Sequence, residues 1–284
     1  MTVESVVSVI IVNFNAGKLL NQCVSSVLAS SIPVSIYVID NASQDNSLQL
    51  LEPLFDKIKL IKNTDNIGFA PAANLVLADT TNSKYLLFLN PDCLIHSDTI
   101  SKFVAVMDKN PQAGMAGCVV RNPDGSEQRS SRRSVPTPWR TIIQVFHLNK
   151  FFQSFLLTNQ ELPTQPIAIE GISGSCMFVR RIALDIVGAM DESYFLHCED
   201  LDWFMRFRAK NFSILFIPNI EIVHFKGVCS TKNPIKVEWY KHRGMVKFYR
   251  KFFRHKYPFI LFWGVITMVW LRFISVAIRQ LFKK

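Results

Sequence analysis

The N-terminal part of the chain alternates between short apolar runs and segments with helical spacing, and this alternation restricts the possible fold more than any other feature. Val6–Val12 is a continuous, mainly β-branched run, which is typical of a strand buried on both faces. Further strands are expected over Val34–Ile39, Lys57–Ile61, Tyr85–Leu89 and Gly114–Val120, with helices between them. Strands and helices that alternate at this spacing predict an α/β fold with a mostly parallel central sheet flanked by helices.

The second half of the chain is less regular. Residues 121–166 contain five prolines and the basic stretch RSSRR (129–133), so we expect a long irregular excursion there. Strand–helix alternation returns over residues 167–224. A helix is expected over residues 199–212, followed by a pair of short strands around Pro218.

Polar residues stand where three of the predicted strands end. Asn13 and Asn15 follow the first strand, Asp40 ends the second, and Asn90 and Asp92 follow a later one. Ligands of open α/β sheets bind outside the carboxyl ends of the strands, so we expect these side chains to share one rim. Ordinary loop polarity is the alternative; it explains each position alone, but three together less well.

The stretch LLFLNPDCL (86–94) places a carboxylate immediately after a buried run. A buried carboxylate is costly unless it is paired or bound to a cation. Because Pro91 fixes the turn, Asp92 is a candidate ligand for Mg²⁺ or Mn²⁺ against a diphosphate, with a helix cap or turn residue as the alternative. In DNIGFAPAAN (65–74), Gly68 stands at a helix entrance, where free N–H groups can meet a nucleotide.

The positive charge of the chain is concentrated at its C-terminal end. Residues 239–284 contain eleven Lys and Arg and no acidic residue, so removing them from the net charge of +10 leaves residues 1–238 at −1. Phe, Trp, Leu and Ile are interleaved with these cations, which suits an anionic membrane surface better than nucleic acid. We therefore expect a catalytic domain over 1–238 and a basic, aromatic-rich, membrane-associating helical tail over 239–284.

Residues 257–278 of this tail contain one charge, Arg272. This segment is long enough to span a bilayer if Arg272 snorkels, while residues 239–256 mix aromatic and cationic residues as in-plane helices do. One anchor helix, a surface-lying helix pair and packing against a partner subunit all remain open. The six cysteines are scattered, which favours a reducing compartment, and the acidic N-terminus does not resemble a signal peptide.

Seven motifs, in this order along the chain, resemble family 2 of the glycosyltransferases, which are inverting enzymes of the GT-A fold, and in particular its rhamnosyltransferase-like branch. The resemblance covers about residues 7–230. The motifs are VSVIIVNFN (7–15), VIDNAS (38–43), NTDNIGFAPAAN (63–74), LFLNPD (87–92), GISGSCMFVRR (171–181), FLHCEDLDWFMRFR (195–208) and VHFKGVCS (223–230).

The resemblance implies roles for the matching positions. Asn90-Pro91-Asp92 stands in the place of the family's D-x-D metal motif, with Asn for the first Asp, so Asp92 is its only carboxylate. His224 matches a histidine that reaches the metal or diphosphate in some relatives, although a structural histidine at a strand end is the alternative. The implied nucleotide-sugar-binding residues are Asn13, Asn15, Asp40, Asn66, Gly68 and Asn90.

Further positions concern the sugar, the diphosphate and the acceptor. Gly174 and Ser175 supply small side chains for a wall beside the donor sugar and the acceptor. Arg132 and Arg133, with Arg129 beside them, are a possible diphosphate clamp, with a solvated basic loop as the alternative.

The Glu199-Asp200 pair matches the acceptor-side acid motif of the family. Inversion by a single in-line displacement needs a carboxylate that takes the proton of the acceptor hydroxyl on the face opposite the leaving diphosphate. Adjacent acids repel each other, which can raise one pKa into a useful range. Asp200 is the expected base and Glu199 orients the acceptor or replaces it as base; N-terminal capping is the structural alternative.

The sequence thus predicts an inverting glycosyltransferase that uses Mg²⁺ or Mn²⁺. Its expected donor is a dTDP- or UDP-linked sugar, plausibly rhamnose, and its acceptor is a lipid-linked glycan at the cytoplasmic face of the inner or plasma membrane. The attachment is peripheral or through a single C-terminal anchor, and no nucleic acid is expected. Asp92 and the Glu199-Asp200 pair should then lie on either side of one cleft.

Other functions are less compatible with the sequence. Transfer of another hexose or an N-acetylhexosamine, or a non-catalytic membrane-associated α/β module, are the open alternatives. A processive synthase would need several membrane spans and a Q-x-x-R-W stretch. A dinucleotide oxidoreductase would need G-x-G-x-x-G where the chain reads NFNAGK.

Overall fold

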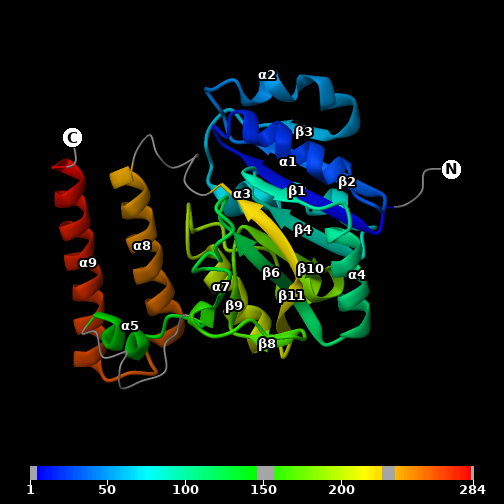
Figure 1. Ribbon diagram of the computed structural model, residues 1–284. Helices are drawn as coiled ribbons and strands as arrows, with labels where there is room; N and C mark the ends of the chain where they lie inside the picture. Colours follow the sequence, from blue (N-terminus) through cyan, green and yellow to red (C-terminus); the bar gives the residue numbers. More distant parts are fainter. Residues whose placement is uncertain (1–4, 146–156, 226–233, 283–284) are drawn as a thin grey trace.

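A mixed β-sheet forms the centre of the molecule in the computed structural model, which describes residues 5–145, 157–225 and 234–282 (Figure 1). Among these residues the strand order is β3-β2-β1-β4-β10-β6-β11-β5, with β8 also paired to β11. The strands are β1 (Val7–Asn13), β2 (Val34–Asp40), β3 (Lys59–Lys62), β4 (Tyr85–Leu89), β5 (Cys93–Ile95), β6 (Ala113–Arg121), β8 (Ile167–Ile169), β10 (Cys176–Arg180) and β11 (Ser213–His224). A separate two-stranded sheet joins β7 (Arg132–Arg133) and β9 (Gly171–Ile172).

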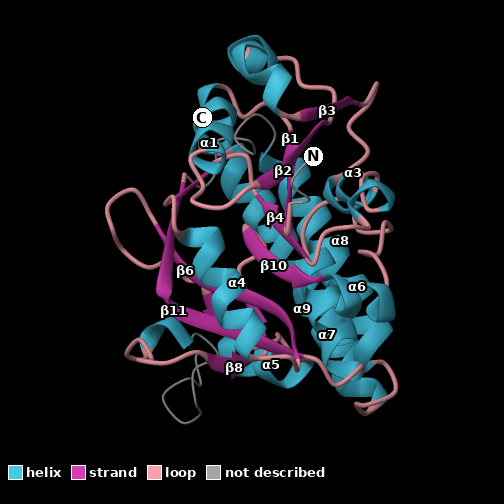
Figure 2. Ribbon diagram, turned by 90° about the vertical axis from the view of Figure 1, so that its right-hand side faces the viewer, coloured by secondary structure: helices cyan, strands magenta, loops and turns pink. Residues whose placement is uncertain are grey.

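Helices cover both faces of this sheet (Figures 1 and 2). Alternate residues of β1 separate the two sides of the core: Val9 belongs to the cluster that includes α1 and α4, whereas Ile10 belongs to the cluster that includes α3, α6, α7 and α8. This alternation is the expected consequence of the two-residue period of a strand. The helices are α1 (Lys18–Leu28), α2 (Ser47–Leu51), α3 (Phe69–Asn74), α4 (Thr99–Lys109), α5 (Pro138–Val145), α6 (Arg181–Val187), α7 (Glu199–Ala209), α8 (Pro234–Phe253) and α9 (Phe259–Leu281), with 3₁₀ turns η1 (Glu52–Lys57), η2 (Ala78–Thr80) and η4 (Leu157–Asn159).

The direction of β10 is important for the site. Strands β1 to β4 run parallel, as predicted, but β10 runs antiparallel to both β4 and β6. Its first residue, Cys176, therefore pairs with the last residue of β4, Leu89. As a result, the segment that enters β10 and the turn that leaves β4 lie at the same edge of the sheet.

The prediction of two short strands around Pro218 was wrong, because β11 is one continuous strand of twelve residues. Its pairing with β6 shifts register between Ile217 and Glu221. Proline has no N–H to donate to a neighbouring strand, so it interrupts the ladder without ending the strand. The predicted excursion contains β7 and α5, and its residues 146–156 lie outside the described part of the chain.

The C-terminal helices α8 and α9 lie side by side at one end of the molecule (Figure 1). Helix α8 begins at Pro234, so the predicted boundary between residues 238 and 239 falls inside it; the division into two domains stays a prediction. Phe248 and Tyr249 of α8 are buried in the main core cluster. Lys251 of α8 also forms an ion pair of 2.7 Å with Asp191. Part of the basic tail is therefore attached to the body of the protein.

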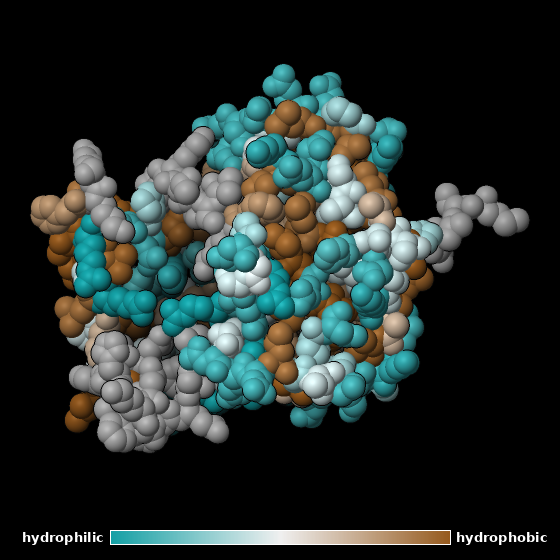
Figure 3. Space-filling model, in the orientation of Figure 1, coloured by the Kyte–Doolittle hydropathy of each residue, from teal (hydrophilic) through white to brown (hydrophobic). Residues whose placement is uncertain are grey.

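Helix α9 has the length and composition of a membrane-spanning helix. Its 18-residue window has a mean hydropathy of 2.0, and only 22% of that window is buried. Large apolar side chains are exposed along it, including Ile260, Leu271 and Leu281, and hydrophobic colour covers this edge of the molecule in Figure 3. It is the only helix of this kind within the described residues, and its exposed face is available for a membrane or another apolar surface.

Candidate active site

The first group of predicted residues meets where β1 and β2 end. Asn13 and Asp40 are register partners on these adjacent strands. The Asn13 Nδ2 group donates hydrogen bonds to Asp40 Oδ1 (2.7 Å), Ser43 Oγ (3.0 Å) and Ser47 Oγ (2.9 Å). The other Asp40 oxygen accepts the Ser43 N–H at 3.1 Å. Asn13 and Asp40 therefore fix the loop after β2 from inside, and their direct contact with a nucleotide stays a prediction.

Gly68 connects this rim with the segment that leads to the Glu199-Asp200 pair. Its N–H donates to Asn66 Oδ1 at 3.0 Å, and its φ is +97°. A Cβ at this position would lie 2.6 Å from the backbone oxygen of Phe195. A side chain is thus excluded both by the backbone conformation and by the close approach of Phe195. Gly68 therefore has a packing role at the start of the six-residue helix α3, in addition to the predicted nucleotide role.

Asn15 also forms hydrogen bonds with the loop that follows β2. Its Oδ1 accepts the Gln44 N–H at 2.8 Å, and its own N–H donates to Ser43 Oγ at 3.0 Å.

The turn after β4 is held by the segment that precedes β10. The Asn90 N–H donates to the Ser175 backbone oxygen at 2.9 Å, and the Asn90 backbone oxygen accepts the Cys93 N–H at 3.1 Å. No described residue forms a hydrogen bond with the Asn90 side chain, which is half-buried and remains available to a ligand. The Ser175 hydroxyl, in contrast, is buried and bonds to Ser173 Oγ at 2.8 Å.

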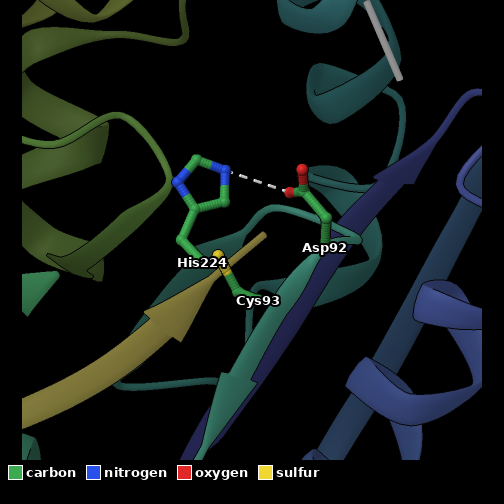
Figure 4. Close-up of side chains that lie close together, drawn as sticks. All are labelled: Asp92, Cys93 and His224. Carbon is green, nitrogen blue, oxygen red and sulfur yellow. Dashed lines mark ion pairs between the residues drawn. The ribbon is translucent and has the colours of Figure 1, made fainter. Parts of the chain in front are cut away.

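Asp92 and His224 come together across the β5–β11 edge, as Figure 4 shows. Asp92 Oδ1 lies 3.1 Å from His224 Nε2, and both residues are buried. Oδ1 accepts no hydrogen bond from the described residues, although it is inaccessible to solvent. Among the described residues no Lys or Arg pairs with Asp92, and its one ion-pair partner there is His224, which is cationic only when its imidazole is protonated.

Gln128 fixes the orientation of the His224 ring. Its Nε2 donates to the His224 backbone oxygen at 2.9 Å, which leaves its Oε1 facing His224 Nδ1 at 3.0 Å. An amide oxygen can only accept, so Nδ1 of His224 carries a proton. Nε2 faces Asp92, where it donates to the carboxylate when it is protonated and can bind a metal when it is not. Gln128 is buried and lies 96 residues from His224 in sequence, and sequence analysis missed it because its stretch stood out only for its arginines.

The ligand atoms of Asp92, Cys93 and His224 all lie within 4.8 Å of one another. Burial raises the pKa of the Cys93 thiol well above its usual range, and the thiol donates to the Ser175 backbone oxygen at 3.6 Å. A protonated thiol is a poor ligand for hard cations, whereas a carboxylate oxygen and an imidazole suit Mn²⁺ and, with water, Mg²⁺. Asp92 and His224 therefore fit a divalent cation whose remaining ligands come from water or a diphosphate.

The acid pair, defined as Glu199 and Asp200, forms the first turn of α7. The two residues before it, His197 and Cys198, both have positive φ, at 68° and 70°. Two consecutive non-glycine residues in this region are unusual, and such backbone strain is concentrated at functional sites. The bend directs the start of α7, with its acid pair, towards the segment before β10.

Asp200 is paired with Arg133. The Arg133 Nη2 group donates to Asp200 Oδ2 in a short ion pair, and its Nε donates to the Ile172 backbone oxygen at 3.2 Å. The Leu201 N–H donates to Asp200 Oδ1 at 2.7 Å. A Cβ on Gly174 would lie 2.9 Å from Asp200 Oδ2, so glycine is needed for this approach.

Glu199 has the opposite environment. It is buried, and its Oε2 has no hydrogen-bond partner among the described residues. Burial, together with the neighbouring Asp200 charge, raises the pKa of Glu199 to about 8. One member of the acid pair is thus paired with a guanidinium, while the other is protonated in most molecules at neutral pH.

A short chain of contacts joins the two halves of the candidate site. Gly174 abuts Asp200, and its neighbour Ser175 accepts the hydrogen bond from Asn90, two residues before Asp92. Asp202, which follows the acid pair, is buried elsewhere and pairs with Arg206 at 2.7 Å. The helical geometry of α7 therefore separates Asp202 from this site.

The structure argues against Arg132 as a diphosphate clamp. Its guanidinium is buried and bonds to both oxygens of Glu127, at 3.1 and 3.3 Å. It also donates to the backbone oxygens of Gln160 and Glu161. These bonds use four of its five N–H groups, so Arg132 holds the excursion together, whereas Arg133, one residue on, reaches Asp200.

Comparisons with known proteins identify the class of this fold and site. Glycosyl transferase family 2 matches residues 8–187, and the chain therefore belongs to this family, with the GT-A glycosyltransferase fold. Its relatives place it in the rhamnosyltransferase-like branch. The N-acetylglucosaminyl-diphospho-decaprenol L-rhamnosyltransferase of Mycobacterium tuberculosis is 26% identical over 245 residues, which cover 81% of this chain and 79% of that protein.

Two further proteins support this relationship. The dTDP-rhamnosyl transferase RfbF of Shigella flexneri is 26% identical over 224 residues, which cover 76% of this chain and 67% of RfbF. A mannosyltransferase from Pyrobaculum calidifontis, solved with GDP-Man and Mn²⁺, superposes with a TM-score of 0.62 at 16% identity and covers 94% of this chain and 69% of that one. That structure shows the same fold, and the family model shows that the chain is a glycosyltransferase.

Proposed function

We propose that this glycosyltransferase moves a sugar, rhamnose in the first place, from a dTDP- or UDP-linked donor to a hydroxyl of a lipid-linked glycan, with inversion at the anomeric carbon. Two relatives carry rhamnosyltransferase names, one of them with a decaprenol diphosphate acceptor. The observation that carries the proposal is the contact chain from the Asp92 turn through Ser175 and Gly174 to Asp200. These contacts support the proposal because they bring Asp92, the proposed metal ligand, and Asp200, the proposed base, to one edge of the sheet.

The donor would bind at the edge formed by β1, β2 and the turn after β4. When bound by Asp92 and His224, a divalent cation neutralises charge on the leaving diphosphate. Gln128 keeps the Nε2 atom of His224 facing Asp92. The half-buried Asn90 amide is available to the donor at the same turn.

On the acceptor side, Asp200 takes the proton of the attacking hydroxyl, and Arg133 and the Leu201 N–H hold its carboxylate in position. Glu199, protonated at neutral pH, orients the acceptor and reduces the repulsion that two adjacent carboxylates would have. Gly174, which lets Asp200 approach closely, would form part of the wall beside the acceptor and the donor sugar.

The reaction would take place at the cytoplasmic face of the inner or plasma membrane. Helix α9 contributes an exposed apolar surface, and the cations of the tail that are not paired with the body attract anionic lipids. A lipid-linked acceptor would then reach the site from the membrane surface.

The test is release of the nucleoside diphosphate from dTDP-rhamnose, with UDP-glucose and UDP-N-acetylglucosamine as competing donors, Mn²⁺, and a membrane lipid extract as acceptor. Release that depends on the lipid extract and is strongest with dTDP-rhamnose is the expected result. Preference for either UDP-sugar would identify a transferase of another sugar. Donor binding without any lipid-dependent release would instead support a non-catalytic module.

A further inference from the structure

A pocket of about 140 Å³, outside the residues assigned above, is lined by residues of α5, α8 and α9. These three helices lie at one end of the molecule (Figure 1). Met245, Tyr249 and Met268 form apolar walls, while Lys241 and Arg272 bring positive charge. None of the described residues that line it is acidic, although Glu238, beside the pocket, pairs with Lys241 at 3.3 Å. The pocket thus combines an apolar surface with two cations, which is the chemistry of a ligand that is anionic at one end and apolar at the other.

One wall of this pocket continues into the segment before the acid pair. The Cys198 Sγ atom lies 3.9 Å from the backbone oxygen of Lys241. A Cβ on Gly244, one turn further along α8, would lie 2.9 Å from the His197 backbone oxygen. Helix α8 therefore packs directly on the two residues that lead into the acid pair, and a ligand at Lys241 lies beside the acceptor side of the site.

The opposite wall belongs to α9, the exposed apolar helix. Arg272 lines the pocket and is the only charged residue between Tyr257 and Ile278. No described carboxylate pairs with Arg272. Arg272 is exposed, so its charge is costly only where α9 contacts a bilayer, and its neighbours Leu271 and Ile274 are 59% and 50% exposed. The pocket is thus bounded by the helix that is suited to contact a membrane.

We propose that this pocket binds the diphosphate and the first isoprenoid unit of a polyprenyl-diphosphate-linked acceptor. The inference rests on the proposed function and specifies how its acceptor is held. Lys241 and Arg272 bind phosphate oxygens by charge-assisted hydrogen bonds, and Met245 and Met268 contact the first isoprenoid unit. The sugar attached to the diphosphate then extends past the start of α8 towards Asp200.

Binding can be tested without turnover, with farnesyl diphosphate as the probe and the full chain in detergent. Arg272→Gln and Lys241→Gln should each raise the Kd by about tenfold, because each removes one ionic contact with the diphosphate. Arg279→Gln is the matched control, since Arg279 is an exposed arginine of α9 outside the pocket, and it should bind as the wild type does. Farnesol should bind equally to all variants. An equal loss in Arg279→Gln would overturn the proposal, because the cations would then act only through general charge.

Two further measurements separate this inference from the proposed function. With a polyprenyl-diphosphate-sugar acceptor, Arg272→Gln should raise the acceptor KM about tenfold and leave the donor KM unchanged. Normal transfer with an unchanged acceptor KM would refute the pocket but not the transferase, whereas selective farnesyl diphosphate binding without transfer would support the pocket and refute the transferase. Binding to phosphatidylglycerol vesicles should be equal in Arg272→Gln and Arg279→Gln. A selective loss of vesicle binding in Arg272→Gln, with farnesyl diphosphate binding unchanged, would assign the pocket to a phospholipid headgroup instead.

Discussion

The Asp92 turn and the start of α7 each bury a carboxylate to a similar extent, with 5% of Asp92 and 9% of Asp200 exposed. Asp200 is paired with the permanent cation of Arg133. Asp92 faces Nε2 of His224, whose other ring nitrogen contacts Gln128, and one Asp92 oxygen has no hydrogen-bond partner among the described residues.

This difference shows how the two carboxylates can serve different chemistry. A buried charge needs compensation, and at Asp200 the fold itself supplies it. At Asp92 the compensating charge comes either from a proton on His224 or from a divalent cation that binds both side chains. The comparison therefore predicts that Asp92 responds to metal, whereas Asp200 acts in proton transfer independently of metal binding.

The largest effect is expected for Asp200→Asn. An amide cannot take the acceptor proton, so kcat should fall by about 10² to 10⁴. Donor affinity and the Mn²⁺ dependence of donor binding should stay as in the wild type, since Asp92 and His224 are untouched. Steady-state release of nucleoside diphosphate and calorimetry with donor measure the two effects. Turnover close to that of the wild type would show that Asp200 is not the base, and a much larger loss in Glu199→Gln would move that role to Glu199.

Asp92→Ala should have the next largest effect. Without its carboxylate, the thermal stabilisation that Mn²⁺ and a nucleotide donor produce together should be lost, which corresponds to about a hundredfold weaker metal-dependent binding. Asp98→Ala is the control, because Asp98 is exposed and pairs only with Lys102 among the described residues. Thermal shift with and without Mn²⁺ is the measurement. An unchanged Mn²⁺ response in Asp92→Ala would remove the basis for a metal at this turn.

Gln128→Leu tests whether metal binding by His224 depends on the hydrogen bonds that Gln128 forms with it. Leucine fills a similar volume but cannot accept the Nδ1 proton, so the ring of His224 loses its fixed tautomer and orientation. Mn²⁺ affinity should fall by about tenfold, less than for Asp92→Ala. Gln128→Glu, which keeps an acceptor for Nδ1–H, should recover part of that affinity. Equal losses in the Leu and Glu variants would indicate a purely structural role for Gln128.

The ends of the first parallel strands could be predicted from the sequence, because a buried apolar run and the polar residue that ends it are both local features. Asn13 and Asp40 were expected at one rim, and the parallel register of β1 and β2 makes them neighbours. Gln128 and the Arg133–Asp200 pair were not predictable in the same way. Gln128 meets His224 across 96 residues, and Arg133 meets Asp200 across 67, so neither contact leaves a local pattern.

Arg132 and Arg133 show the limit of local patterns most directly. They are adjacent and chemically identical, and the sequence assigned them one role. In the two-residue strand β7 their side chains point to opposite faces, so Arg132 turns into the excursion and Arg133 towards α7. The opposite directions of two adjacent side chains can be predicted only when the strand itself is recognised. Strand β7 has two residues, which is too short for its composition to reveal it.

The smallest effect is expected for Glu199→Gln, measured as stability against pH. Because the folded protein raises the pKa of Glu199 from 4.5 to about 8, the folded state keeps a proton that the unfolded chain releases between these values. Stability contributed at this position is therefore present at low pH and is lost as pH rises towards 8. Glutamine cannot ionise. Between pH 5 and pH 8 the Tm of Glu199→Gln should therefore decrease by a few degrees less than the Tm of the wild type.

Glu52→Gln, at an exposed position, should follow the wild-type pH profile. Identical profiles for wild type and Glu199→Gln would mean that Glu199 is ionised in the fold, and the contrast between a paired Asp200 and a protonated Glu199 would no longer hold.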